Sequence, residues 1–158
     1  MTFGAGILRW RWDGSQYTAE GNLDTGAAHP RGPRVSVDAE GNAWFSGRDG
    51  FAVHLEETDQ WVSVPAPEAL RAPGSSFESP FISADGSHLV GRGPGGLVER
   101  VGGEWRSLPA GVGYPNEGFV DVRLSPAGDL WVSTQRAASI RRDGAWQVLR
   151  GPGAEPPK

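Results

Sequence analysis

Two sequence landmarks recur along this chain of 158 residues with nearly the same period. The first is a glycine in a polar turn, which occurs at Gly41, Gly86 and Gly128, with separations of 45 and 42 residues. The second is a tryptophan that closes each unit, which occurs at Trp61, Trp105 and Trp146, with separations of 44 and 41 residues. Because the two landmarks are independent and give one period, they indicate a structural repeat of about 40–50 residues.

The last copy of the repeat is the most complete. Residues 124–134 show the pattern of a strand, a glycine-centred turn and a strand, and residues 140–149 form a second such pair around Asp143-Gly144. An Asp-Gly pair between two β-rich runs is a strong hairpin signal, because a type I′ turn needs positive φ at both central residues. Four short strands in about 30 residues, with a tryptophan in the second and the fourth, predict one antiparallel blade of a β-propeller.

The upstream copies extend the same architecture. We expect blades at residues 34–64, 80–108 and 119–150, joined by loops at residues 20–33, 65–79 and 109–118. Residues 1–19 hold a further hairpin around Asp13-Gly14, which aligns with the third and fourth strands of a blade and has no first pair before it. The predicted fold class is all-β: a β-propeller-like array of four-stranded antiparallel blades that forms an incomplete ring in one chain. Residues 151–158 have no pattern to bury and are expected to be a disordered tail.

The repeated aromatic positions have two interpretations. Trp44, Leu89 and Trp131 align in the second strands, as do the closing tryptophans in the fourth strands. Such a series can stack on sugars, but a position that is repeated in every blade is explained more economically as packing between blades. In the first hairpin, Trp10 and Trp12 alternate with arginines, so one face is aromatic and the other is charged. We expect these two tryptophans at the surface or at an interface.

Three motifs within residues 111–149 stand in the order of a known repeat. They are a Gly-Val-Gly-Tyr-Pro loop that begins at Gly111, the run Gly-Asp-Leu-Trp-Val at Gly128 and the run Ile-Arg-Arg-Asp-Gly at Ile140. In this order they resemble the two-component-regulator type of propeller repeat, which is found in sensor ectodomains and in lyase-like bacterial propellers. Residues 34–64 match it well and residues 80–108 match it loosely, because Leu89 replaces the tryptophan. The resemblance implies the propeller fold, and it implies no single role because the family hosts many functions.

Composition and charge disfavour several classes of partner. The net charge is −4 and the arginines, which make up all but one of the 15 basic residues, are scattered, so no nucleic-acid binding is expected. The absence of cysteine excludes a disulfide framework and a thiolate metal site. No run approaches the roughly 18 apolar residues of a membrane span, and the first residues do not resemble a signal peptide, so no membrane partner is expected. A cytoplasmic protein is the favoured interpretation, and an excised piece of a larger exported protein is the alternative.

Three short motifs invite a chemical interpretation. Residues 91–96 match Gly-x-Gly-x-x-Gly, but Pro94 interrupts the loop and a strand follows instead of a helix, so no dinucleotide or other cofactor is expected. The Ser-x-Asp-x-x-Gly-x-x-Trp run at residues 36–44 resembles the Asp-box of sialidase-like propellers with one extra residue, a device in which Asp38 would bond backbone amides of the turn. His54-x-x-Glu57 lacks the helix that a zinc site of this kind needs, and no metal site is expected.

The loops that join successive blades open on the same face as the loops between second and third strands, and propellers normally bind ligands on this face. The joining loops of this chain are long, which in compact domains is typical of functional segments. We therefore expect a non-enzymatic recognition module that binds a protein, a small molecule or a carbohydrate there. The candidate contacts are Arg48, Asp49, Phe77, Glu78, Tyr114, Asn116, Gln135 and Arg136.

The sequence leaves two other functions open. One is a lyase or a glycoside-type hydrolase in which His54 or His88 works against a carboxylate of another blade, although the carboxylates are spread singly. The other is an architectural homo-oligomer. Three and a half blades leave both ends of the arc uncovered, so we expect self-association through the terminal blades, with a dimer of seven blade equivalents favoured.

Overall fold

The computed structural model describes residues 7–23, 31–72, 77–115, 119–135 and 137–150. In these residues 12 of the 14 strands form three four-stranded antiparallel sheets, and in each sheet the strands follow one another in chain order. The other two strands form a separate hairpin. The predicted fold class is confirmed: the chain is all-β, its sheets are arranged as blades, and the described strands form no closed ring.

Each sheet is called a blade here. Blade 1 consists of β3 (Arg31–Val37), β4 (Ala43–Ser46), β5 (Gly50–Leu55) and β6 (Gln60–Pro65). Blade 2 consists of β7 (Glu78–Ile82), β8 (His88–Gly93), β9 (Gly96–Val101) and β10 (Glu104–Pro109). Blade 3 consists of β11 (Phe119–Leu124), β12 (Leu130–Thr134), β13 (Ala137–Arg142) and β14 (Ala145–Arg150). A short 3₁₀ turn, η2 (Glu68–Leu70), lies in the connection between blades 1 and 2.

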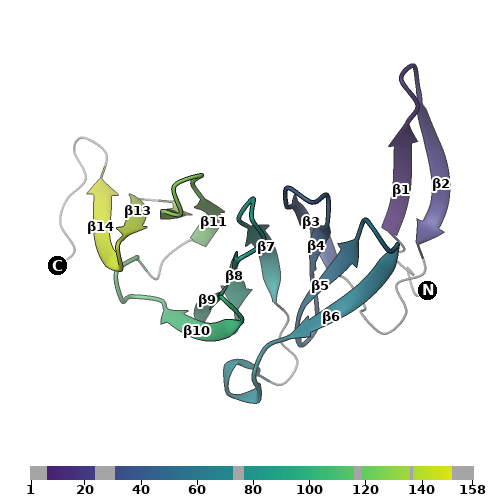
Figure 1. The fold of residues 1–158 in the computed structure, drawn as a ribbon. Helices are drawn as coiled ribbons and strands as arrows, with labels where there is room; N and C mark the ends of the chain where they lie inside the picture. Colours follow the sequence, from purple (N-terminus) through teal and green to yellow (C-terminus); the bar gives the residue numbers. More distant parts are fainter. Residues whose placement is uncertain (1–6, 24–30, 73–76, 116–118, 136, 151–158) are drawn as a thin grey trace.

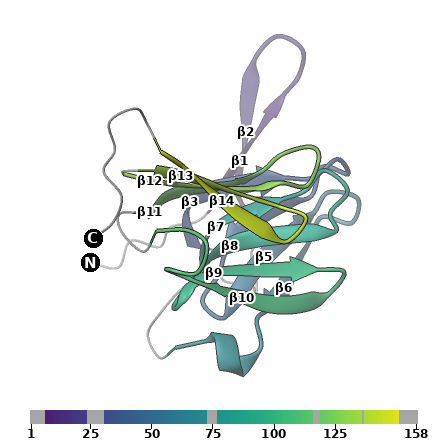
Figure 2. The same cartoon turned by 90° about the vertical axis from the view of Figure 1, so that its left-hand side faces the viewer.

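The three blades stand side by side along an open arc (Figure 1), and a view from the side shows their sheets stacked face to face (Figure 2). The strands alternate in direction, so the turns within each blade lie at two opposite ends of its sheet. The connection that carries η2 lies on the lower side of Figure 1, opposite the β3–β4 and β7–β8 turns.

Local turn chemistry forms the strand pairs. The landmark glycines each donate their N–H to the carbonyl three residues earlier, at Asp38, Ser83 and Ser125. In blade 1 the Asp38 carboxylate accepts backbone N–H bonds from Glu40 at 3.1 Å and from Asn42 at 2.9 Å, as the Asp-box interpretation predicts. In blade 3, Asp143 and Gly144 have φ of 50° and 80°, which is the geometry expected of a type I′ hairpin.

The β7–β8 turn corrects the sequence alignment of the blades. In blades 1 and 3 the turn is closed by a backbone bond that spans four residues, from Asp38 to Asn42 and from Ser125 to Asp129. In blade 2 the equivalent bond spans five, from the Ser83 N–H to the His88 carbonyl. Because successive strand residues face opposite sides of a sheet, one extra residue moves the next side chain to the other face. Val90, and not Leu89, therefore occupies the position of Trp44 and Trp131.

The core consists of two apolar clusters between blades. Junction 1 joins blade 1 to blade 2, with Trp44, Phe51 and Val53 on one side and Ile82, Leu89 and Val98 on the other. Junction 2 joins blade 2 to blade 3, with Val90 and Leu97 on one side and Val122, Leu124, Leu130 and Val132 on the other. Blade 2, which lies between the other two, thus packs both of its faces against a neighbour.

The tryptophans of the fourth strands pack toward the preceding blade. Trp105 stacks on Phe51 of blade 1 with ring centroids 6.0 Å apart, and Trp146 lies against Tyr114 at 5.4 Å. Trp61 contacts Phe45 at 5.2 Å within its own blade, because no blade precedes blade 1 in the described residues. Trp105 and Trp146 confirm the expectation of packing between blades. Trp131 does not: it is exposed, because no blade follows blade 3 in the described residues.

The N-terminal hairpin consists of β1 (Ile7–Trp12) and β2 (Tyr17–Leu23), and it projects away from the blades (Figures 1 and 2). Its predicted turn is present, but the pair forms no hydrogen-bonded sheet with any other described strand, and so it does not complete a blade within this chain. Trp10 and Trp12 are both about half exposed, as the alternating pattern predicts. The expected tail at residues 151–158 lies outside the described residues.

Replacement of Trp146 by alanine tests the packing between blades 2 and 3. We expect Trp146→Ala to lower the free energy of unfolding by about 3 kcal/mol, at the lower end of the range for buried tryptophans, because the ring is only partly buried. The matched control is Trp10→Ala on the exposed hairpin, for which we expect a change within about 0.5 kcal/mol. Urea unfolding of both variants measures the difference. Equal free energies of unfolding for the two variants would contradict the assignment of Trp146 to junction 2.

Candidate functional site

The candidate site lies on the loop face, defined as the end of the sheets that holds the β4–β5, β8–β9 and β12–β13 turns and the connections between blades. These segments meet at one end because the strands of each blade alternate in direction. A pocket of about 250 Å³ opens on this face of blade 2. It lies between the β8–β9 turn and the connection to blade 3, and its lining residues are Arg92, Gly93, Pro94, Gly95, Gly96, Ala110, Tyr114 and Pro115.

Tyr114 anchors one wall of the pocket. Its hydroxyl donates to the Leu108 carbonyl at 2.7 Å and accepts the Leu97 N–H at 3.0 Å, so it joins the connection to β9 and β10 of blade 2. Its ring packs against Trp146 of blade 3. Burial raises the pKa of Tyr114 above its usual range, and the hydroxyl therefore remains a neutral donor at physiological pH.

Gly96 allows the connection to approach the β8–β9 turn. A Cβ at this position would lie 2.7 Å from the Tyr114 hydroxyl oxygen and 2.8 Å from the Ala110 nitrogen. Both distances are shorter than a carbon atom tolerates, and the Ala110 nitrogen belongs to the backbone, so the wall could not adjust easily. The shape of the pocket thus depends on glycine at this position.

Arg92 supplies the charge at the pocket. Its Nη1 lies 3.8 Å from the Glu78 carboxylate oxygen Oε2, and both side chains are more than half exposed. An exposed ion pair at this distance contributes little to stability. The guanidinium carries donors for charge-assisted hydrogen bonds to an anionic or hydroxyl-bearing group at the pocket.

The eight candidate contacts do not share one environment. Arg48 and Asp49 lie exposed in the β4–β5 turn, Glu78 is exposed at the start of β7, and Gln135 is exposed after β12. Phe77 is fully buried in junction 1 and Tyr114 is nearly so in junction 2. Asn116 and Arg136 lie outside the described residues. Of the six candidates within the described residues, Tyr114 alone lines the pocket.

Sequence reasoning missed Arg92 and the glycine-rich turn beside it as site residues. The glycine-rich run at residues 91–96 is visible in the sequence, but its pattern is that of a dinucleotide motif and does not indicate a pocket. The structure shows that the run joins two strands, β8 and β9, as expected. A glycine-rich turn that leaves its backbone open to a neighbouring loop has no sequence signature of its own, because the neighbour comes from another part of the chain.

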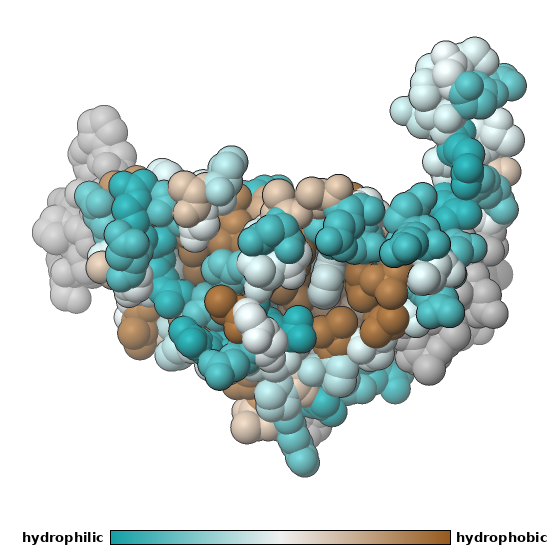
Figure 3. All heavy atoms as spheres, in the orientation of Figure 1, coloured by the Kyte–Doolittle hydropathy of each residue, from teal (hydrophilic) through white to brown (hydrophobic). Residues whose placement is uncertain are grey.

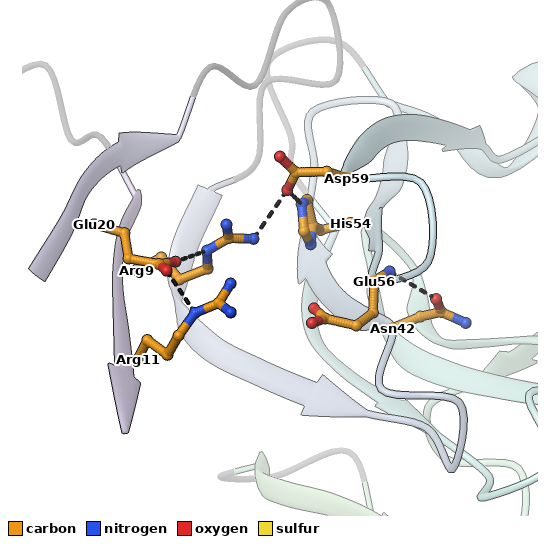
Figure 4. A network of polar contacts seen from close by, with 7 residues as sticks. All are labelled: Arg9, Arg11, Glu20, Asn42, His54, Glu56 and Asp59. Carbon is orange, nitrogen blue, oxygen red and sulfur yellow. Dashed lines mark hydrogen bonds and ion pairs between the residues drawn. The ribbon is translucent and has the colours of Figure 1, made fainter. Parts of the chain in front are cut away.

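His54 belongs to a polar network between blade 1 and the hairpin (Figure 4). Its Nε2 lies 2.9 Å from Oδ1 of Asp59, and Arg9 donates to the same oxygen at 2.9 Å. Glu20 accepts from Arg9 and pairs with Arg11. The bonds from His54 and then Arg9 lower the pKa of Asp59, so this carboxyl group is ionised at neutral pH. The network ties the hairpin to the β5–β6 turn of blade 1.

His88 lies beside a buried ion pair at junction 2. Glu99 on β9 is almost fully buried and accepts a hydrogen bond from Arg141 of β13 at 2.8 Å. His88 Nε2 lies 3.3 Å from the same carboxylate oxygen, without hydrogen-bond geometry. Burial acts to raise the pKa of Glu99, but the neighbouring His88 and Arg141 outweigh it and lower this pKa from its ordinary value. A carboxylate held ionised by an arginine is a weak proton acceptor, which suits a link between blades better than a general base.

Comparison with known proteins provides no further assignment. No family model, no curated protein and no solved structure matches the chain. In the described part of the chain, no three His, Cys, Asp or Glu side chains are grouped so that they could hold a metal ion. The same residues contain no helix with the length and hydropathy to span a membrane.

The Glu99–Arg141 pair makes stability depend on pH. Because the pKa of Glu99 is lowered in the folded protein, its contribution is present above the ordinary value of 4.5 and is lost as the pH falls through the lower folded value. We expect Glu99→Gln to cost about 1–3 kcal/mol at pH 7 and progressively less below about pH 4.5. Urea unfolding of the parent and the variant over this range measures the difference.

Glu104→Gln is the matched control, because Glu104 pairs with Arg106 at 3.5 Å on the exposed side of β10. We expect a change within about 0.5 kcal/mol at every pH. A Glu99→Gln penalty that stays constant down to pH 3 would show that packing, and not the charge, is lost in this variant.

Proposed function

We propose that this chain is a non-enzymatic recognition module of the β-propeller type, which binds its ligand on the loop face at the pocket beside Arg92 and Tyr114. The observation that supports the proposal is the pocket itself, because it is built from a β8–β9 turn and a blade-joining connection. These are the two kinds of segment through which propellers bind ligands.

The size and lining of the pocket favour a small occupant. Its volume of about 250 Å³ is below the roughly 300–1,000 Å³ of pockets for drug-sized ligands. A single sugar ring, or one side chain of a partner protein, matches this volume. Pro94, Ala110 and Pro115 offer apolar contact, and Arg92 offers charge-assisted hydrogen bonds to a carboxylate or hydroxyl group.

Binding is favoured over catalysis by the residues around the pocket. Among the described residues that line it there is neither a histidine nor a carboxylate. His54 and His88, the residues that a lyase or hydrolase would use, are instead engaged in the hairpin network and beside the Glu99–Arg141 pair. The two-component-regulator type of repeat remains our proposal for the family, on the motifs of residues 111–149.

Chemical-shift mapping tests the proposal. The ¹⁵N-labelled chain is titrated with monosaccharides, sugar acids and N-acetylated amino acids, each at millimolar concentration. We expect at least one of these probes to shift, as a group, the amide signals of residues 92, 93, 95 and 96 and of residues 110–114. Arg92→Ala should weaken the binding of that probe by about tenfold, because a charge-assisted hydrogen bond is lost.

Arg106→Ala is the control, since Arg106 is also exposed and also pairs with a carboxylate, but lies on β10 outside the pocket lining. We expect it to bind the probe as the parent does. Shifts that gather around His54 or His88 instead would favour the enzymatic alternative. If no probe moves the pocket amides, the proposal fails for ligands of this size.

A further inference from the structure

The two junctions inside the chain show how these blades pack on one another. In each blade, the forward face looks toward the following blade and the backward face looks toward the preceding one. Junction 1 joins the forward face of blade 1 to the backward face of blade 2, and junction 2 repeats this between blades 2 and 3. Within the described residues two pairs of faces are thus packed together, and the backward face of blade 1 and the forward face of blade 3 have no neighbouring blade.

The forward face of blade 3 is partly exposed: Ile140 on this face is buried, whereas Trp131 and Leu149 are among the exposed apolar residues. Trp131 occupies the position of Trp44 and Val90, as the turn geometry shows. Trp44 is 8% exposed and Val90 is 0% exposed, because each packs against the next blade. Trp131 is 38% exposed.

The backward face of blade 1 is also exposed in part, along β3, whereas Ala52 and His54 of β5 on this face are buried. Val37 immediately precedes the turn of its blade, as Ile82 and Leu124 do in the other two. Ile82 and Leu124 are 3% and 7% exposed, whereas Val37 is 57% exposed. Val35 on the same face is also more than half exposed, although its equivalent Val122 is buried. Figure 3 shows the side of the molecule on which β5 and β6 lie in front of β3, and there, too, apolar side chains reach the surface over blade 1 and are bordered by hydrophilic ones.

The N-terminal hairpin does not cover these valines. It is tied to blade 1 through Asp59, in the turn between β5 and β6. Val35 and Val37 lie on β3, which is the opposite edge strand of the sheet. At junction 1 the first strand of blade 1, β3, packs against the first strand of blade 2, β7. The exposed part of the backward face of blade 1 is the part that a first strand of a preceding blade would cover.

We propose that the forward face of blade 3 packs against the backward face of blade 1 of a second copy of this chain. The occupant is a second copy because the internal junctions show that blades of this sequence present complementary forward and backward faces. Two copies related by a two-fold axis would form both contacts at once and place six four-stranded blades in one ring, within the four to eight blades of closed propellers. Each contact would need about 500 Å² from each copy to reach the size of a stable interface.

Light scattering tests the association. At micromolar concentration we expect a mass of twice 16.8 kDa for the parent chain. Trp131→Glu and Val37→Asp should each reduce the mass twofold, because each places a charge in both contacts of the ring. Val112→Asp is the matched control, because Val112 is 62% exposed in the connection after β10 and lies on neither end face. It should retain the doubled mass.

A mixing experiment tests the head-to-tail arrangement. Each of the two variants alone lacks one kind of face, but the forward face of Val37→Asp and the backward face of Trp131→Glu are intact. An equimolar mixture should therefore associate through one contact and recover part of the doubled mass. Circular dichroism melts confirm that both variants are folded, as expected for side chains that are exposed in the single chain.

Three results would overturn the proposal. The first is a monodisperse parent monomer, which would mean that a different partner or a further segment covers the ends. The second is a doubled mass that neither variant reduces, and the third is a mixture that associates no better than its components, which would place the contact between like faces.

Discussion

Packing between the faces of consecutive sheets is the interaction on which the rest of this structure depends. A single four-stranded sheet has two apolar faces and can cover neither by itself, so each blade is stable only beside its neighbours. The approach at junction 1 is close: a Cβ on Gly91 of blade 2 would lie 2.5 Å from the Phe51 ring of blade 1. The turns, the polar links and the pocket are all positioned by these contacts.

Polar groups add direction to this packing. At junction 1 the Ser36 hydroxyl of blade 1 accepts the Ile82 N–H of blade 2 at 3.1 Å, and within blade 1 Trp44 donates its indole N–H to Asp38 at 3.0 Å. At junction 2 the Glu99–Arg141 pair links the two sheets. A one-residue slip of either strand would separate this pair and leave a buried charge without its partner, which is strongly unfavourable. The polar links therefore select one register among those that apolar packing alone would allow.

The loop-face pocket is a consequence of the same junctions. The connections between blades must cross from one sheet to the next, and each inserts an aromatic ring where it crosses. Phe77 packs between Phe51 and Trp105 at junction 1, and Tyr114 packs on Trp146 at junction 2. Because Tyr114 also has a hydroxyl group, it bonds to blade 2 and holds the pocket wall, whereas Phe77 only fills space. The two aromatic candidates thus support the loop face from inside the junctions, and Arg92 is the exposed charged side chain at the pocket.

The sequence by itself determined the strands, the turns and the blade repeat, because these depend on signals within a few residues: Asp143-Gly144, the landmark glycines and the carboxylate of Asp38. Only the tertiary structure decided which equivalent side chains are buried. Trp44 and Trp131 have the same local sequence context, yet one is buried and the other exposed, because only one of them has a following sheet. The sequence likewise did not predict the extra residue before Val90, the burial of Phe77 or the pocket beside Arg92. Each of these depends on which segment lies opposite, and contacts between segments distant in the chain leave no local pattern.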